Sequence, residues 1–248
     1  MISPEKIQRA NELIKSSRKT AVFTGAGISV PCGIPPFRGP GGVWNRYDPG
    51  LLSIDRFRKS PEESWDAIRE IFYPDNMVIK PSRSHEILAQ MESKGFISTV
   101  ITQNIDSLHS KAGSVNVLEL HGNSSKAVCL TCTAVMDLTT KLLALRVPRC
   151  PHCSTGLLKP SFTFFGEPLD GRTLEDAFHQ ALQCDLMICI GSTGEVMPAA
   201  AVPAATSTSG GKIIEINPIR SNFTSSITDL HLQATSDEVL EVISSLLF

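Results

Sequence analysis

Short apolar runs alternate with helix-like segments along the chain, and this alternation restricts the possible folds more than any other feature. The runs have the length and composition of buried strands. The expected strands are residues 21–24, 97–102, 115–120, 186–190, 212–216 and 231–234. The expected helices are residues 4–17, 61–72, 84–93, 172–183, 198–207 and 237–247. The pattern predicts an α/β fold with a Rossmann-like, doubly wound parallel sheet.

Polar or small residues follow most of these predicted strands. Because the carboxyl ends of parallel strands meet at one edge of a sheet, we expect these residues to line one ligand-binding crevice. In chain order they are Gly25, Ala26, Gly27, Gln103, Asn104, Ile105, Asp106, His121, Gly122, Gly191, Ser192, Thr193 and Asn217.

The first strand leads into a long loop that is rich in glycine and proline. Gly25 and Gly27 are spaced closely enough for backbone N–H groups to approach a phosphate. The next glycine is Gly33, which is too distant for the usual dinucleotide fingerprint. Phe37 and Arg38 then add an aromatic ring and a cation. The loop predicts a nucleotide pocket with a covering segment, and a plain surface loop is the alternative.

Four cysteines form two Cys-x2-Cys pairs that are separated by seventeen residues. This spacing is typical of a structural zinc site, in which four thiolates form a tetrahedron around the ion. Such a site has no open position for water or substrate, so one zinc ion should stabilise the fold without taking part in catalysis. Four unrelated thiols are the alternative. The cysteines are Cys129, Cys132, Cys150 and Cys153.

The cysteine pairs interrupt the alternation of strands and helices. We therefore expect residues 123–156 to form a small zinc-binding module, with modest helix potential at 135–145. Residues 1–122 and 157–248 then form the Rossmann-like domain, with a second small helical insertion around residues 35–80.

His121 is the best candidate for a general base, because histidine titrates near working pH and this one ends a predicted strand. A hydrogen-bonded histidine without a chemical role is the alternative. Gln103, Asn104 and Asp106 could orient a ribose, an amide or a water, or they could simply cap the next helix. His85 and His109 lie in helix-like settings, where we expect satisfied or solvated side chains.

The composition excludes several classes of protein. The formal net charge of −2 gives no overall attraction to nucleic acid or to an acidic membrane. The sequence contains neither a signal-peptide pattern nor an apolar run of about 18 residues, so we expect a cytoplasmic protein. Without a secretion signal, the odd number of cysteines, seven, argues against a disulfide framework. Few basic residues surround the cysteine pairs, and no direct nucleic-acid binding is expected.

Taken together, these motifs resemble those of the sirtuins, the NAD-dependent protein lysine deacylases, over essentially the whole chain. The resemblance implies that NAD and an acyl-lysine peptide meet in the cleft beside the zinc module. The acyl oxygen would attack the anomeric carbon of the nicotinamide ribose, and His121 would deprotonate a ribose hydroxyl. The products would be nicotinamide, free lysine and O-acyl-ADP-ribose. The matching motifs are Gly25-Ala26-Gly27-Ile28-Ser29, Gly33-Ile34-Pro35, Phe37-Arg38, Thr102-Gln103-Asn104-Ile105-Asp106, Leu120-His121-Gly122, the cysteine pairs, Phe165-Gly166-Glu167, Gly191-Ser192-Thr193 and Ile216-Asn217.

The same resemblance implies roles for individual residues. Asn104 would orient the water or ribose, Asp106 would hold the nicotinamide carboxamide, and Phe37 would cover the reactive carbon. The implied NAD contacts are Gly25, Ala26, Gly27, Phe37, Arg38, Gln103, Asn104, Ile105, Asp106, Gly191, Ser192, Thr193, Asn217 and Ser236. The peptide would add as a strand between two segments, a mode with little sequence specificity. Those segments contain Phe164, Phe165, Gly166 and Glu167, and Gly194, Glu195 and Val196.

Three sites depart from the family pattern. Pro36 stands where the family usually has Asp, and Gly194 stands where it usually has a bulky apolar residue. Ser192-Thr193 stands where the family usually has Thr-Ser or Ser-Ser. The Tyr-x-x-Arg pair of members that prefer acidic acyl groups is absent from residues 64–69, so we expect a neutral acyl group. Two other readings remain: a mono-ADP-ribosyltransferase that uses the same pocket, or a non-catalytic NAD-responsive binding module.

Overall fold

A parallel six-stranded sheet with the order β3-β2-β1-β7-β8-β9 lies at the centre of the computed structural model, which describes residues 2–39, 41–74 and 79–248. This is the order of a doubly wound dinucleotide-binding sheet, in which the sequential order of the strands reverses between β1 and β7. The predicted fold class is confirmed. The strands are β1 (Thr20–Thr24), β2 (Thr99–Thr102), β3 (Val117–Glu119), β7 (Leu186–Ile190), β8 (Lys212–Ile216) and β9 (Leu230–Leu232).

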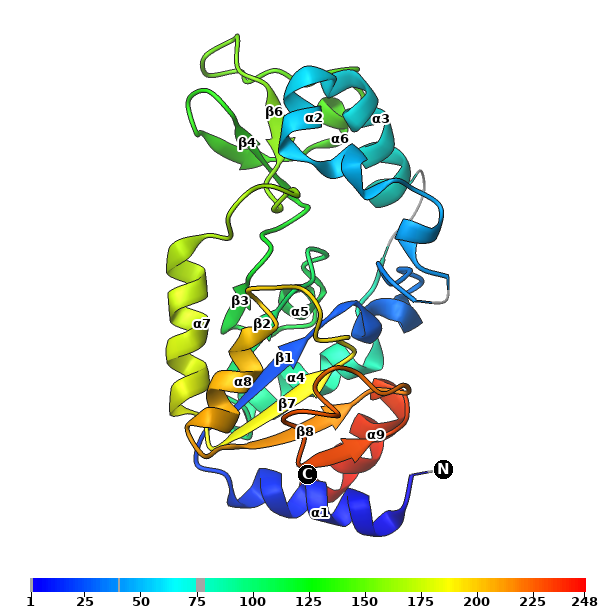
Figure 1. Cartoon of the computed structure of the whole chain (residues 1–248), viewed down its shortest axis with the longest axis vertical. Coiled ribbons are helices and arrows are strands. Elements are labelled where there is room, and N and C mark those ends of the chain that lie inside the picture. The colour runs from blue at the N-terminus through cyan, green and yellow to red at the C-terminus, as the bar shows by residue number, and fades with distance from the viewer. Residues whose placement is uncertain (1, 40, 75–78) are drawn as a thin grey trace.

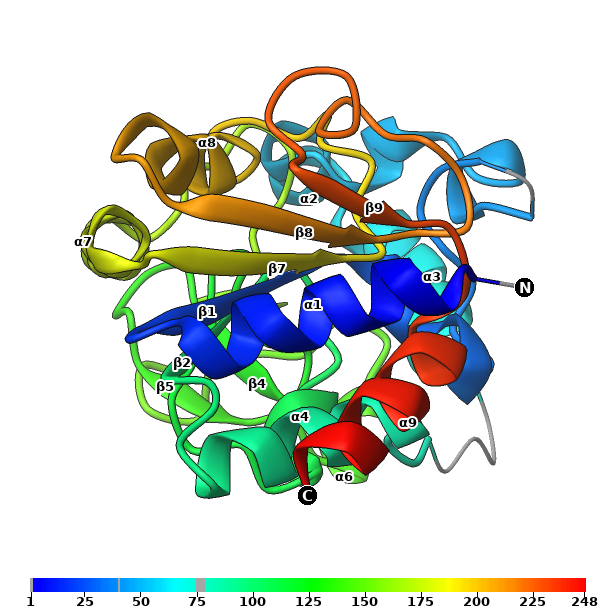
Figure 2. The ribbon, with the colours of Figure 1, turned by 90° about the horizontal axis from the view of Figure 1, so that it is seen from below.

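Helices cover both faces of this sheet (Figure 1, Figure 2). One face carries α1 (Pro4–Ser16), α4 (Arg83–Ser93) and α9 (Ser236–Leu247), and the other carries α7 (Gly171–Gln183) and α8 (Ala201–Thr208). Successive side chains of each strand point to opposite faces of the sheet, as the two-residue period of a strand requires. In β1, Val22 packs with the first group of helices, while Ala21 and Phe23 pack with the second.

A smaller lobe lies apart from the sheet, at the top of Figure 1. It contains an antiparallel sheet with the order β5-β4-β6 and several short helices. Trp65 and Phe57 of the helices pack against Phe162 and Phe164 beside the small sheet, so the two predicted insertions share one core. The elements are β4 (Lys126–Cys129), β5 (Val135–Asp137), β6 (Leu158–Pro160), α2 (Ile54–Lys59), α3 (Pro61–Phe72) and α6 (Thr140–Leu143).

Short elements lead from β1 of the sheet to this lobe. They are η1 (Ala26–Cys32), η2 (Val43–Asn45) and η3 (Pro49–Leu52). A further short helix, α5 (Leu108–Lys111), joins β2 to β3. Residues 40 and 75–78 of the predicted insertion at 35–80 lie outside the described residues.

The structure differs from the predictions mainly within the small lobe. Residues 135–137 form strand β5 and not part of a helix, because Val135 and Asp137 pair with β4. Only residues 140–143 of that stretch are helical. Strand β6 lies after the predicted end of the module at residue 156, because it pairs with the other edge of β4. The helix predicted from residue 198 begins at Ala201.

None of the described helices combines the length and the hydropathy that a membrane span requires.

Two neighbouring residues of α9 provide a test of the packing on the sheet. Ile243 is 1% exposed and belongs to the core beneath the sheet, whereas the side chain of Val242 is 46% exposed. We expect Ile243→Ala to lower the free energy of unfolding by about 2–5 kcal/mol, because it leaves a cavity. Val242→Ala should change it by less than about 0.5 kcal/mol. Urea denaturation measures both, and equal effects would contradict the assigned packing.

Candidate active site

A cavity of about 410 Å³ opens along the carboxyl ends of the parallel strands. It lies where the strand order reverses between β1 and β7, the usual position of a ligand in this fold. The structure thus brings together most of the residues predicted to bind a nucleotide. The predicted residues that line this cavity are Gly25, Ala26, Gly27, Phe37, Arg38, Gln103, Asn104, His121, Gly191, Ser192, Thr193, Val196, Asn217 and Ser236.

A second cavity of about 1010 Å³ extends from the first towards the small lobe. Ala26, Phe37 and Asn104 line both cavities, so they stand at the boundary between them. Ile105 and Asp106 line the second cavity but not the first. The predicted pocket is therefore divided into two connected parts.

The backbones after β1 and β7 touch at their glycines. The Gly27 N–H donates to the Gly191 carbonyl at 2.9 Å, and the Gly25 N–H donates to the Ile190 carbonyl at 2.9 Å. A Cβ atom at Gly27 would lie 2.5 Å from the Gly191 Cα, which no real side chain tolerates. The third glycine, Gly33, instead ends η1 with a φ of 83°, which explains why it does not match the dinucleotide spacing.

Asn104 is held at the floor of the crevice. Its side-chain amide donates to the Gly25 carbonyl at 3.2 Å and to Ser29 Oγ at 3.3 Å. Ser29 Oγ in turn donates to Asp106 Oδ2 at 2.7 Å, and Asp106 Oδ1 accepts from the Leu108 N–H at 2.9 Å. Asp106 therefore both caps the next helix and orders Asn104. Sequence reasoning did not select Ser29 as a site residue, although it lies inside the glycine motif.

His121 follows β3 and is half-buried. Its Nδ1 lies 2.9 Å from the Gln103 carbonyl, which can only accept, so Nδ1 carries the proton and Nε2 keeps its lone pair. Burial lowers the pKa of His121 below 6.5, and the bond to Gln103 opposes this shift. The ring is thus a neutral base that presents Nε2 beside the cavity.

Phe37 and Arg38 lie on the loop that covers the crevice. The Phe37 ring stacks on Trp44, with the ring centroids 5.5 Å apart. The Trp44 N–H donates to the Phe37 carbonyl at 3.1 Å, which closes the loop on itself. Arg38 pairs with Glu195 at 3.8 Å across the crevice, and both side chains are about half exposed. The ion pair is worth little in stability, but it links the two sides of the opening.

Buried contacts of Lys159 and Glu167 hold the segment that was predicted to bind a peptide. Lys159 is buried, and its Nζ pairs with Glu167 Oε2 at 2.9 Å and donates to the Phe162 carbonyl at 2.6 Å. Burial lowers the pKa of Lys159, and Glu167 opposes the shift. The Phe164 side chain is 2% exposed, and its N–H donates to Glu167 at 2.8 Å. Of the predicted peptide contacts, Phe164 thus faces inwards. No sequence pattern indicated the Lys159–Glu167 pair.

The opposite edge of this opening contains Gly194, which has a φ of 71°. A Cβ atom there would lie 3.0 Å from the ring of Phe223, so Phe223 fills the space that a side chain would need. Asn222 donates its backbone N–H to the Thr193 carbonyl at 3.0 Å and its side-chain amide to the Gly194 carbonyl at 3.3 Å. Both positive φ and close packing therefore favour glycine at this position.

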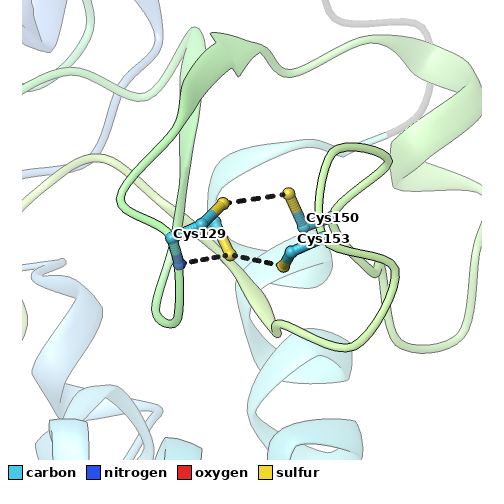
Figure 3. A group of neighbouring side chains, drawn as sticks. Cys129, Cys150 and Cys153 are labelled. Atoms are coloured by element: carbon cyan, nitrogen blue, oxygen red, sulfur yellow. Dashed lines mark hydrogen bonds between the residues drawn. The ribbon is translucent and has the colours of Figure 1, made fainter.

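The four cysteines meet in the small lobe (Figure 3). All four sulfurs lie within 4.8 Å of one another. The Cys129–Cys153 and Cys132–Cys150 sulfurs are 3.7 and 3.6 Å apart, close to the ~3.8 Å edge of a tetrahedron with metal–sulfur bonds of about 2.3 Å. Backbone N–H groups of Thr131 and Cys132 point at the Cys129 sulfur, as expected for a thiolate. The donor set and its size fit one zinc ion.

The fold and the site define a nucleotide-binding α/β protein with an attached four-cysteine metal module. The profile of the Sir2 family matches residues 25–198, which include the glycine loop, the strand-end polar residues and the cysteines. The chain belongs to the Sir2 family.

Relatives of known name and structure match over most of the chain. An NAD-dependent protein deacylase of Aeropyrum pernix is 40% identical over 245 residues, which cover 97% of each chain. An NAD-dependent protein deacetylase of Thermotoga maritima is 42% identical over 215 residues, or 86% of this chain and 87% of the relative. A structure of Sir2 with a p53 peptide and NAD+ superposes with a TM-score of 0.88 at 37% identity, covering 97% of this chain and 98% of the other.

Removal of one cysteine of the quartet tests the metal centre. We expect the purified protein to contain one zinc per chain and Cys150→Ser to contain much less, because three thiolates bind zinc far more weakly. Cys32→Ser is the matched control, since Cys32 lies outside the quartet. Elemental analysis measures the zinc content, and thermal melting should show a loss of stability only for Cys150→Ser. A full equivalent of zinc in Cys150→Ser would contradict the site.

Proposed function

We propose that the protein is an NAD-dependent protein lysine deacylase, with acetyl-lysine as its preferred substrate. The observation that carries the proposal is the placement of Asn104 and His121 on one cavity with the glycine crossing of Gly25, Gly27 and Gly191. A nucleotide bound in this cavity would place its sugar beside an amide and a neutral base. The names of the relatives support the same activity.

NAD fits the residues of the smaller cavity. At the glycine crossing a Cβ atom on Gly27 or Gly191 would collide with the opposite backbone, so these glycines let the two loops meet at the edge of the cavity. The Gly25 and Gly27 N–H groups donate to the Ile190 and Gly191 carbonyls, so they are not free to bind a phosphate. At the other end of the cavity, the Ser236 hydroxyl is buried and has no hydrogen-bond partner among the described residues. We assign this hydroxyl and Asn217 to the adenosine half, and Ala26, Ile105 and Asp106 to the nicotinamide half.

The division of roles at the reacting centre follows from the hydrogen bonds. When bound, NAD would supply an electrophilic anomeric carbon as nicotinamide leaves. Asn104, fixed by the Gly25 carbonyl and Ser29, would orient the ribose or a water. His121 Nε2 would accept a proton from a ribose hydroxyl. The proton on Nδ1 would stay on that nitrogen, hydrogen-bonded to the Gln103 carbonyl. Phe37 would exclude water from above.

An acyl-lysine peptide would enter between the segments around Gly166 and Glu195. The backbone N–H and carbonyl groups of Gly166 and Glu195 themselves make none of the hydrogen bonds found within the described part of the chain, so they are available to a peptide strand. The backbone N–H groups of Phe164 and Phe165 already have partners. The Phe164 N–H donates to Glu167, and the Phe165 N–H donates to the Leu52 carbonyl at 2.9 Å. We therefore assign peptide pairing to Gly166 and Glu195, with Val196 beside them.

A neutral acyl group suits the larger cavity. Asp66 and Glu70 line it, and the Arg69 guanidinium already pairs with Asp66 at 3.4 Å and donates to the Arg146 carbonyl at 2.8 Å. An acidic acyl group would meet these carboxylates before it could recruit the cation. Acetyl or a longer apolar chain avoids that cost.

We also propose a division of the chain into domains. Residues 123–160 would form the zinc module, because β6 completes the small sheet. The helices between residues 49 and 72 would belong to the same lobe, because they share its core. The other described residues would form the NAD-binding domain.

The central test compares the wild type with His121→Ala on acetyl-lysine and succinyl-lysine peptides, with and without NAD. We expect deacetylation that requires NAD and yields O-acetyl-ADP-ribose. His121→Ala should lower the rate by at least about 100-fold, because a general base contributes about 10²–10⁴-fold. Succinyl-lysine should react at least about tenfold more slowly, a difference of ~1.4 kcal/mol. Mass spectrometry follows every product.

His179→Ala, on the exposed end of α7, is the control and should keep full activity. Nicotinamide release without peptide, or transfer of label from NAD onto protein, would instead indicate an ADP-ribosyltransferase. NAD binding without turnover in either form would indicate a non-catalytic module.

The pH profile tests the state of His121. A lowered pKa keeps the ring neutral, and therefore basic, down to a pH below 6.5. We expect kcat/KM to be constant from pH 8 to about 6.5 and to fall only at lower pH, as the ring becomes protonated. Steady-state rates across this range provide the measurement. An acid limb centred above pH 6.5 would contradict the assigned environment.

A further inference from the structure

A chain of buried hydrogen bonds lies behind Asn104. Thr24 and Thr102 are register partners at the ends of β1 and β2. The Thr24 hydroxyl donates to Thr102 Oγ1 at 2.8 Å, and the backbone N–H of Asn104 donates to the same Thr102 oxygen at 3.0 Å. All three residues are less than 5% exposed. The main chain that carries Asn104 is thus tied to two threonine hydroxyls.

The chain of bonds continues to His109, whose Nε2 lies 2.9 Å from Thr24 Oγ1. The Thr24 hydroxyl has one proton, which it directs to Thr102 in the assigned hydrogen-bond network. In this network the Thr24 oxygen accepts a hydrogen bond from the Nε2–H group of His109. His109 then carries no proton on Nδ1, and this buried atom has no hydrogen-bond partner among the described residues.

His85 lies against His109, with the ring centroids 4.7 Å apart. The Ser82 backbone N–H donates to His85 Nδ1 at 3.2 Å, so in the neutral ring the proton is on Nε2. This Nε2 atom is also buried and without a partner. The independent tautomers of the two rings thus leave one buried donor, on His85, and one buried acceptor, on His109.

The charges around the pair favour two neutral rings. Burial lowers the pKa of both histidines, that of His109 to about 3, and His85 further opposes a charge on His109. The nearby carboxylates act in the opposite direction but are occupied. Asp106 accepts from Ser29 and the Leu108 N–H, and Asp237 accepts from Ser84.

We propose that His85 and His109 form a neutral pair in ring contact, each protonated on Nε2, and that His109 is a positioning residue for Asn104, acting through Thr24 and Thr102. This inference rests on the proposed function, which assigns the orientation of the ribose to Asn104. The path from His109 Nε2 to the Asn104 N–H consists of three hydrogen bonds of 2.9, 2.8 and 3.0 Å. Loss of any one of them frees the strand end on which Asn104 sits.

The ring tautomers can be measured without any activity. Nitrogen-15 NMR of the histidine rings in the intact protein should show Nε2–H forms for both His85 and His109, neutral at pH 6. The Asn104 side-chain amide signals should shift in Thr24→Val and remain in place in Thr206→Val. Thr206 is an equally buried threonine whose hydroxyl donates to the Ala181 carbonyl, away from the site. An Nδ1–H form of His109, or a charged ring at pH 6, would overturn the pair.

Kinetics then test the positioning role. We expect Thr24→Val to lower kcat about tenfold with little change in KM for the peptide, and Thr206→Val to lower the melting temperature only. His109→Leu should lower kcat similarly, while His109→Gln should recover most of the rate, because its amide offers both a donor and an acceptor. Thr24→Val in an Asn104→Ala background should cause no further loss.

The outcomes separate the two proposals. Additive losses in the double variant would show that Thr24 and His109 do not act through Asn104, and would overturn the positioning role while the deacylase assignment stands. An inactive wild type would overturn the deacylase assignment, and the Asn104 amide signals would still decide whether the bond chain fixes this residue.

Discussion

The contact between the backbones of Gly27 and Gly191 is the constraint on which the site depends. The two backbone segments follow the neighbouring strands β1 and β7, and they meet without side chains between them. This approach brings the loop after β1 close to the loop after β7 at the point where the sheet reverses its order. The crevice lies along this line of contact, so a methyl group at either glycine would force the strand ends apart before any ligand could bind.

Sequence reasoning located the large sheet and the crevice because their signals are local. Each buried strand is a short apolar run, and the polar residue that follows it is adjacent in sequence, as with Thr102 and Gln103. Parallel geometry then supplies the convergence of the strand ends. The four-cysteine metal site could also be predicted from the sequence, because the spacing of the cysteines reflects the geometry of the metal and not that of the surrounding fold.

The features that sequence reasoning missed depend on contacts between distant segments. Strand β5 is short and exposed at Val135, so it lacks the apolar run of a buried strand and exists only because β4 offers an edge. The ion pair of Lys159 with Glu167 resembles surface charges in the sequence, and only the fold buries it. His109 was expected to be satisfied or solvated, yet it is buried, and one of its ring nitrogens has no hydrogen-bond partner within the described part of the chain.

The shared core of the small lobe has a consequence for the modularity of this protein. The Trp65 indole donates to the Leu158 carbonyl at 3.1 Å, and its ring lies in one cluster with Phe57 and Phe164. The lobe is therefore built from two stretches of chain, one between β1 and β2 and the other between β3 and β7. A zinc module transplanted alone into another scaffold would expose an aromatic surface, so the transferable unit must include both stretches.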